Sequence, residues 1–321
     1  MTAASAELRR PLITVQLCTY NRRALLGRVL EALFHQDLDP NDYEIVLVDD
    51  GSNDGTYEEI LRHVRPTCAF QLVRQRNAGL ARGRNVGIER ARGEIILFMD
   101  DDVLATSNLL STHVRFHREH QRTICRGVAI NVESFDNLPP PTYSLRNYSG
   151  AYFWTTNVSA PLALIRETGN FDERFREYGW EDLELGFRLR RKGVPSLLAR
   201  DAVVYHFKPP LVPAQFARAA RQARAQARTA RQFFAKHPHW RIGLATGQIA
   251  PLLWWSTVAR RAGWPAVLER IASPGQDQNG WPMGLRRWAA ERFARSEYFD
   301  ELKVDTRSAV DTRSTAPGDP S

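Results

Sequence analysis

Cysteine is scarce in this chain of 321 residues, and long apolar runs are missing. The three cysteines, Cys18, Cys68 and Cys125, are scattered and odd in number, without the spacing of a metal site. This usage predicts a reduced, cytoplasmic setting. No stretch approaches the roughly 20 apolar residues of a membrane span, and the first 13 residues have no apolar core of signal-peptide length. We therefore expect a protein that is neither secreted nor membrane-spanning.

Acidic side chains are absent between Ala202 and Leu268. The same stretch holds ten cations: Lys208, Arg218, Arg221, Arg224, Arg228, Arg231, Lys236, Arg241, Arg260 and Arg261. Subtracting these ten from the net charge of +8 leaves about −2 for the rest of the chain. The basic character therefore belongs to one segment, while the 43% hydrophobic and 25% charged composition is that of an ordinary soluble globular protein.

Strand and helix patterns alternate four times over about 100 residues. The predicted strands are Ile13–Tyr20, Tyr43–Val48, Phe70–Val73 and Ile95–Met99. Helical patterns follow the first three, at residues 25–34, 57–64 and 77–92. The last strand is too short for a buried helix and is apolar throughout, which is typical of a strand buried on both faces. The alternation predicts an α/β fold with a mainly parallel sheet and helices on both faces.

Polar residues follow three of these strands: Thr19 to Arg22, Asp49 with Asp50, and Asp100 to Asp102. In such a sheet, ligands bind beyond the carboxyl ends of the strands. Carboxylates gathered there are costly to desolvate unless a cation or hydrogen-bond donors meet them. Mg²⁺ or Mn²⁺, shared with a phosphate, suits such oxygen ligands best. An acidic surface turn is the alternative for one strand end, but three ends at one edge favour a site.

The remaining patterns are less regular. They predict helices over residues 107–120 and from 181 onward, and strands over 123–132, 152–160 and 196–206. Prolines near residue 210 mark a boundary, after which come a plain helix over 214–236 and an apolar run with two tryptophans over 249–259. We expect a catalytic domain over residues 1–210, a basic helical appendage over 211–303 and a disordered tail over 304–321.

Five short motifs occur in a fixed order along the first part of the chain. They are Thr19–Arg22, Val48–Ser52, Asn77–Gly79 continuing to Arg84 and Asn85, Asp100–Asp102, and Gly179–Asp182. Each is weak alone, but together, over about residues 12–209, they resemble the inverting family 2 glycosyltransferases of GT-A fold. The Trp-Glu-Asp segment is similar to that of galactosyltransferases. The resemblance implies transfer of a sugar from a nucleoside diphosphate donor, commonly UDP-linked, to a hydroxyl acceptor on a glycan, a lipid-linked molecule or a small molecule.

The resemblance assigns donor binding to one group of residues: Thr19, Tyr20, Arg22, Asp49, Asp50, Asn77, Arg84, Asp100, Asp101 and Trp180. Tyr20 would lie against the base, Asp49 would accept a base N–H, and Arg84 would bind the diphosphate. Other interpretations stay open. Tyr20 could be a core residue, Asp50 and Ser52 could cap the next helix, and Arg84 could be a solvated helix residue. Gly150 and Asn157 are weaker candidates for contact with the sugar.

A cofactor, Mn²⁺ or Mg²⁺, follows from the same resemblance. Asp100 and Asp102 match the ends of the family's Asp-x-Asp motif, with Asp102 as the direct ligand and Asp100 nearer the ribose or the metal-bound waters. His206 matches a histidine that completes the coordination shell in metal-dependent relatives. Because it stands between apolar residues, a satisfied core histidine is the alternative.

Asp182 is the candidate general base, since inversion requires one carboxylate to take the proton of the acceptor hydroxyl. Its position at a helix N-terminus predicts a pKa that is not raised far. Glu181 is expected to hold the acceptor, and Trp180 to form a platform for a sugar ring or to fill the core. The alternative is that Glu181, Asp182 and Glu184 are first-turn acids of a surface helix.

Three interpretations compete for the basic stretch 214–261. It could pack an alanine seam on the catalytic domain with a solvated arginine face, or contact an anionic membrane surface through its arginines with Trp254 and Trp255. The third is dimerisation. We expect a cytoplasmic protein. If the second interpretation holds, it would be peripheral at the inner face of the membrane. Nucleic acid is not an expected partner, because no nucleic-acid-binding motif accompanies the charge.

Two other functions compete with glycosyl transfer. A sugar-phosphate nucleotidyltransferase can share the sheet and the metal aspartates, but it would be expected to carry a glycine-rich phosphate loop near its N-terminus, and residues 19–23 contain no glycine. A non-catalytic scaffold that binds sugar nucleotides would be expected to lack a base or a metal ligand, whereas Asp102 and Asp182 are both present.

Overall fold

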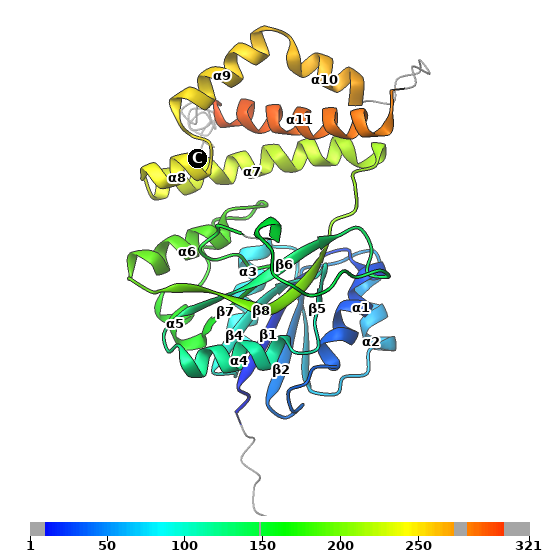
Figure 1. The fold of residues 1–321 in the computed structure, drawn as a ribbon, viewed down its shortest axis with the longest axis vertical. Coiled ribbons are helices and arrows are strands. Elements are labelled where there is room, and N and C mark those ends of the chain that lie inside the picture. Colours follow the sequence, from blue (N-terminus) through cyan, green and yellow to red (C-terminus); the bar gives the residue numbers. More distant parts are fainter. Residues whose placement is uncertain (1–9, 148, 273–280, 305–321) are drawn as a thin grey trace, which may run out of the picture. The chain divides into compact units, whose positions relative to one another are not determined.

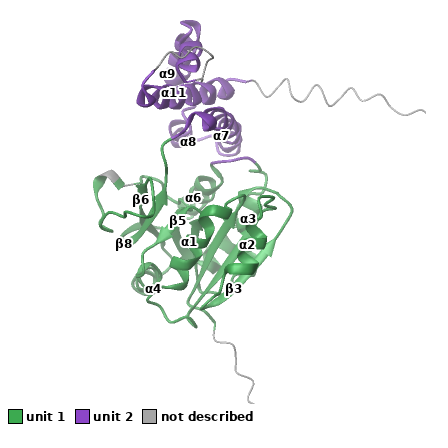
Figure 2. Ribbon diagram, turned by 90° about the vertical axis from the view of Figure 1, so that its right-hand side faces the viewer, with its two compact units in different colours: residues 1–176, 180–210 green, residues 177–179, 211–321 purple. Residues whose placement is uncertain are grey.

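The computed structural model describes residues 10–147, 149–272 and 281–304. The chain forms two compact units (Figure 2). Unit 1 comprises the residues up to Arg176 together with Trp180–Pro210, and unit 2 comprises Glu177–Gly179 together with the residues from Leu211 onward. The tail expected over 304–321 lies outside the described residues from position 305 onward.

Four parallel strands form the first half of the sheet in unit 1, in the order β3-β2-β1-β4 (Figure 1). They are β1 (Ile13–Thr19), β2 (Tyr43–Asp49), β3 (Ala69–Arg74) and β4 (Ile95–Asp100). Every residue of β1 and β2 is buried, as expected for strands that are covered on both faces. The predicted α/β fold with a parallel sheet is therefore confirmed.

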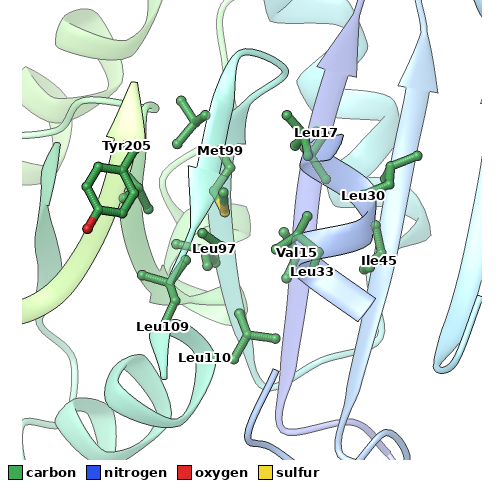
Figure 3. Packing of buried hydrophobic residues seen from close by; sticks show 14 of the residues in the cluster. Val15, Leu17, Leu30, Leu33, Ile45, Leu97, Met99, Leu109, Leu110 and Tyr205 are labelled. Atoms are coloured by element: carbon green, nitrogen blue, oxygen red, sulfur yellow. The ribbon is translucent and has the colours of Figure 1, made fainter. Parts of the chain in front are cut away.

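Helices cover both faces of this sheet (Figure 1). The first three are α1 (Arg23–Phe34), α2 (Thr56–His63) and α3 (Leu80–Arg90). Because side chains of a strand alternate in direction, β4 contributes to two separate cores. Leu97 and Met99 pack in the core that includes the leucines of α1 (Figure 3). Ile96 and Phe98 pack in the core that includes Ile88 of α3.

Four further strands extend the sheet beyond β4, in the order β7-β6-β8-β5. They are β5 (Val103–Ala105), β6 (Ile124–Val132), β7 (Asn157–Pro161) and β8 (Ser196–Phe207). Strand β7 runs antiparallel to β4 and β6, whereas β6 and β8 are parallel, so this half of the sheet is mixed. The helices here are α4 (Leu109–Glu119), α5 (Leu162–Glu167), α6 (Glu181–Arg191) and the short 3₁₀ helix η1 (Leu145–Asn147).

The second half departs from the sequence prediction at two places that matter for the site. The strand expected over 152–160 begins only at Asn157, because Thr155 and Thr156 form a turn. The sequence pattern does not reveal β5, whose three residues take strand form by pairing with β8. That pairing sets Val103 opposite His206 and so brings His206 next to the aspartates that end β4.

Unit 2 is helical. After the 3₁₀ helix η2 (Pro213–Gln215) it contains α7 (Phe216–Lys236), α8 (Trp240–Ala245), α9 (Ala250–Arg261), α10 (Trp264–Ala272) and α11 (Met283–Leu302). The alanine seam expected in the basic stretch is buried in α7 at Ala220, Ala227 and Ala230, together with Phe233. In Figure 1, α11 lies along α7, and α9 and α10 arch over α11.

The arginines of α7 do not form a wholly solvated face, contrary to one of the expectations above. Arg224 pairs with Glu297 of α11, and Arg231 lies 3.2 Å from Glu301 of the same helix. Arg228 donates through Nε to both carboxylate oxygens of Glu177 at 3.0 Å. Helix α11 and Glu177 supply acids where the basic segment has none, so three of the arginines neutralise charge inside unit 2.

Candidate active site

The carboxyl ends of β1, β2 and β4 bring the expected polar residues to one edge of the sheet. In the parallel register, Thr19 is paired with Asp49, and Cys18 with Asp100. Tyr20 and Asp101, the next residues along β1 and β4, therefore start from the same edge. This is the edge at which α/β sheets bind ligands.

The loop after β1 is tied to the loop after β2. The backbone N–H of Asn21 donates to Ser52 Oγ at 2.9 Å, and the Asn21 side chain accepts from the N–H of Asn53 at 2.9 Å. Asn21 has φ +56°, a left-handed conformation that asparagine tolerates better than most residues. This loop leaves Tyr20 47% exposed above the buried Thr19, so the core interpretation of Tyr20 is wrong and its stacking on a base stays a prediction.

Asp49 is fully buried and holds the turn that follows β2. Its Oδ1 accepts hydrogen bonds from the N–H and the Oγ of Ser52, at 3.0 and 2.5 Å. Its Oδ2 has no hydrogen-bond partner among the described residues and lies 3.5 Å from Nε of Arg74. Only Oδ2 is therefore left to accept a base N–H, and that contact stays a prediction.

Asp50 organises the loop before α3. Its carboxylate accepts from the backbone N–H groups of Ala78 and Gly79 at 2.9 Å, and its carbonyl accepts from Asn77 Nδ2 at 3.0 Å. The interpretation that Asp50 and Ser52 cap the next helix is wrong. The N-cap residue of α2 is Gly55, and no side-chain hydrogen bond caps this helix. The second and third motifs are thus parts of one hydrogen-bonded loop structure.

Asp101 and Asp102 face the guanidinium of Arg22. Its Nε lies 3.3 Å from Asp101 Oδ1 and its Nη2 lies 3.1 Å from Asp102 Oδ2. Burial, reinforced by the charges of Asp100 and Asp101, raises the pKa of Asp102 to about 7. Burial also raises the pKa of Asp101 to about 6, although Arg22 opposes the shift. One guanidinium therefore leaves negative charge at this edge of the sheet uncompensated, and a further cation would be stabilised there.

His206 and Asp102 are the two side chains that best suit the binding of a metal ion. Nε2 of His206 lies 3.5 Å from Oδ1 of Asp102. The imidazole is buried, its Nδ1 has no hydrogen-bond partner among the described residues, and burial lowers the pKa of His206 to about 4. The interpretation of a satisfied core histidine therefore does not hold. A neutral imidazole beside a carboxylate supplies two of the common metal-ligand types.

The expected set of three metal ligands is not assembled. Over the described ranges 10–147, 149–272 and 281–304, no three His, Cys, Asp or Glu side chains are grouped so that they could hold a metal ion. Asp100 is bonded elsewhere: its Oδ2 accepts from Thr156 Oγ1 at 2.7 Å, and its Oδ1 lies 3.4 Å from Nη2 of Arg84. The pair Asp102 and His206 would need other ligands, such as donor phosphates and water.

Arg84 joins the aspartate cluster to the start of α6. Its Nη1 donates to Oε1 of Glu181 at 2.5 Å, while its Nη2 faces Asp100. Both Arg84 and Glu181 are 4% exposed, so the interpretation of Arg84 as a solvated residue is wrong. The guanidinium already binds two carboxylates, and its contact with a diphosphate stays a prediction.

The acids at the start of α6 are not surface residues. Glu181 and Glu184 are buried, which excludes the surface-helix interpretation for both. Oε2 of Glu181 has no hydrogen-bond partner among the described residues, and contact of this group with an acceptor stays a prediction. Trp180, the N-cap residue, is partly buried and has φ +73°, which turns the chain sharply into the helix.

Asp182 is partly exposed and held at both carboxylate oxygens. Oδ1 accepts from the N–H of Leu183 at 2.7 Å, and Oδ2 lies 3.5 Å from the N–H of Thr155. Burial and the charge of Glu181 raise the pKa of Asp182 to about 7. The expectation of a pKa near its usual value is therefore wrong, because burial and Glu181 outweigh the stabilising effects of Arg84 and the helix N-terminus.

Thr155 and Thr156 stand where the family resemblance places glycine and small residues that line the donor sugar, but their contacts with Asp182 and Asp100 were not predicted from the sequence. Thr155 reaches Asp182 through its N–H, and Thr156 reaches Asp100 through its hydroxyl, so one turn contacts both carboxylates. The side chain of the adjacent Asn157 is hydrogen-bonded within the fold, and its contact with a sugar stays a prediction. This residue is 4% exposed, its side chain donates to the carbonyl groups of Val128 and Ala202, and its Oδ1 lies 3.0 Å from a ring nitrogen of His113.

A family model described as glycosyl transferase family 2 matches residues 14–171, which include four of the five motifs. Residues 14–171 therefore form a glycosyl transferase family 2 domain. It is 30% identical over 230 residues to validoxylamine A glucosyltransferase of Streptomyces hygroscopicus subsp. limoneus, covering 60% of this chain and 51% of that protein. It is 27% identical over 246 residues to chondroitin synthase of Escherichia coli, covering 62% and 35%.

Several solved structures share the fold of this chain. The mannosyltransferase PcManGT from Pyrobaculum calidifontis, in complex with GDP-Man and Mn²⁺, has a TM-score of 0.57 at 20% identity, covering 92% of this chain and 86% of that one. Residues 1–349 of S. aureus TarS, in complex with UDP-GlcNAc, have a TM-score of 0.55 at 19% identity, covering 94% and 92%. These likenesses confirm the GT-A fold.

The chain spans about half the length of the validoxylamine A glucosyltransferases that it matches. Within the part of the chain that the structure describes, each helix is too short or too polar to pass through a bilayer.

Proposed function

We propose that this chain is a glycosyltransferase that moves a sugar from a nucleoside diphosphate donor to a hydroxyl acceptor with inversion at the anomeric carbon. Among nucleoside diphosphate donors, we favour a UDP-sugar. The observation that carries the proposal is the position of Asp182. A carboxylate with a raised pKa lies at the start of α6 and is connected through one turn, Thr155 and Thr156, to the aspartates at the end of β4. A base and a cation site are what such a transfer requires.

Two further observations support the donor class. Structures that share the fold are complexes with UDP, UDP-GlcNAc or GDP-Man, and a related protein of partial coverage is named a glucosyltransferase. In this chain, the exposed ring of Tyr20 and the loops of Asp49 and Asp50 lie at the edge of the sheet where a nucleotide would bind. The donor sugar is left unspecified by these features.

A divalent cation, Mn²⁺ or Mg²⁺, is part of the proposal. Asp102 and His206 would hold it, since they face one another and the negative charge around them exceeds what Arg22 supplies. When bound, such an ion stabilises the charge that develops on a departing diphosphate. Arg22 bonds the same aspartates in the described structure, so we expect it to share or exchange these contacts.

The chain's own residues would carry the proton transfer. Asp182 accepts the proton of the acceptor hydroxyl while the hydroxyl oxygen forms a bond to the anomeric carbon. The bond from that carbon to the phosphate oxygen breaks, and its electron pair leaves with the nucleoside diphosphate. Arg84 binds Glu181 and Asp100, and Thr155 contacts Asp182, so these residues fix the base relative to the cation site.

The test is the isosteric substitution Asp182→Asn, with Asp201→Asn, an exposed position on β8, as the matched control. We expect Asp182→Asn to abolish transfer, while UDP with Mn²⁺ still raises the melting temperature as it does for the unmodified protein. Asp201→Asn should keep both properties. Turnover of Asp182→Asn close to that of the unmodified protein would remove Asp182 from the mechanism. Absence of any stabilisation by nucleoside diphosphates would contradict the donor class.

A further inference from the structure

Helix α9 exposes an apolar face. No residue of this helix is buried. Trp254 is 65% exposed, Trp255 64% and Val258 38%. With Pro251, which is also exposed, these residues follow the i, i+3, i+4, i+7 spacing that places side chains on one face of a helix. Large apolar side chains left in water in such an arrangement are typical of an interaction surface.

Helix α10 follows α9 after a tight corner and also exposes apolar side chains. Gly263, with φ +76°, ends α9 and lets the chain turn directly into α10. Trp264 is 55% exposed and Val267 is 50% exposed, three residues apart on the outer side of α10. The core of unit 2 includes Leu268 and Ala272 of α10, with the partly buried Ile271 packed against it, but neither Trp264 nor Val267. We call the five residues Trp254, Trp255, Val258, Trp264 and Val267 the α9–α10 surface.

Cations flank the α9–α10 surface. Arg260 and Arg261 stand at the corner, and Arg270 follows on α10, against one acid on these two helices, Glu269. Arg260 pairs with Asp300 of α11. Among the described residues, Arg261 has no acidic partner within ion-pair distance. Three of the five α7 arginines, by contrast, form ion pairs inside unit 2. The cations nearest in sequence to the five residues of the α9–α10 surface are those at the corner and Arg270.

We propose that the α9–α10 surface binds the surface of an anionic lipid bilayer. The tryptophan rings would lie at the level of the lipid head groups, which tryptophan favours, and Arg261 would contact lipid phosphates. A second copy of this chain is a poorer occupant, because two like-charged surfaces would face one another. The helices would lie in the interface, in keeping with their length and polarity.

The proposal concerns unit 2 alone and holds whether or not the transfer reaction is as proposed above. It is tested by vesicle flotation with the full chain, comparing vesicles of phosphatidylcholine with vesicles of phosphatidylcholine and phosphatidylglycerol. We expect binding to the anionic vesicles, weakened by added salt. Trp254→Ala with Trp255→Ala should lower the partition coefficient at least about tenfold, which corresponds to about 1.4 kcal/mol. Arg261→Gln should lower binding to anionic vesicles only.

The matched control is Trp240→Ala on α8, since Trp240 is 66% exposed but stands outside the α9–α10 surface. It should bind vesicles as the unmodified protein does. Because all four substituted side chains are exposed, circular dichroism and thermal unfolding should show folded variants. Equal vesicle binding by the double variant, or equal losses in Trp240→Ala, would overturn the proposal. So would lipid-independent dimerisation, measured by sedimentation, that the double variant abolishes.

Discussion

Replacing Arg84 by methionine should be among the most destabilising single changes in unit 1. Its guanidinium is 4% exposed and bonds Glu181, also 4% exposed, at 2.5 Å, with Asp100 at 3.4 Å and the ring of Phe171 beneath it. Methionine keeps the apolar stem but removes the charge, so Glu181 is left buried without its counter-ion. Breaking a buried pair in this way costs about 3–5 kcal/mol, a large part of the roughly 5–15 kcal/mol that stabilises a typical domain.

Urea unfolding followed by circular dichroism measures this cost. The double variant Arg84→Met with Glu181→Gln should lose less than the sum of the two single variants, by about 1–3 kcal/mol, because the second change removes the uncompensated charge. The control is Arg122→Met, which breaks the exposed pair with Glu167 and should leave the midpoint nearly unchanged. If Arg84→Met is no less stable than Arg122→Met, the argument from burial is refuted.

Two further predictions concern the base and the loop before α3. Since burial and Glu181 raise the pKa of Asp182 to about 7, the carboxylate becomes protonated as pH falls through that value, and kcat/KM at saturating Mn²⁺ should fall about tenfold per pH unit below it. A flat profile from pH 6 to about 8 would exclude this role. Gly79→Ala should lower the free energy of unfolding, measured in urea, by about 1–3 kcal/mol, because Gly79 has φ +90° and a Cβ there would lie 2.6 Å from a carbonyl oxygen. Gly27→Ala, within α1 and with open space around it, should instead stabilise by about 0.5–1 kcal/mol.

The first half of the sheet was predictable because each strand is a short apolar run buried on both faces, and each run is followed by polar residues. This pattern is local, and it indicates both the parallel sheet and the edge at which Asp49 and Asp100 lie. The existence of a site at that edge follows from the same few residues.

The contacts within the site could not be predicted in the same way. From the sequence, Arg84 cannot be distinguished from an exposed cation on a helix. Its burial depends on Glu181, 97 residues further along the chain. Thr155 and Thr156 continue an extended pattern, yet they form a turn because Asp182 and Asp100 offer partners there. The α7 arginines look solvated until α11 supplies acids. In each case the deciding interaction is between residues far apart in sequence.

The segment Glu177–Gly179 has a consequence for any attempt to shorten this protein. It precedes α6 directly, but it is grouped with unit 2, where Glu177 bonds Arg228 and the Tyr178 carbonyl accepts from the hydroxyl of Thr229 at 3.1 Å. A truncated chain ending at Pro210 would keep every motif of the family yet lose both of these partners. The residues that lead into Trp180 would then lack both contacts, and the last of them, Gly179, lies only three positions before Asp182, the proposed base.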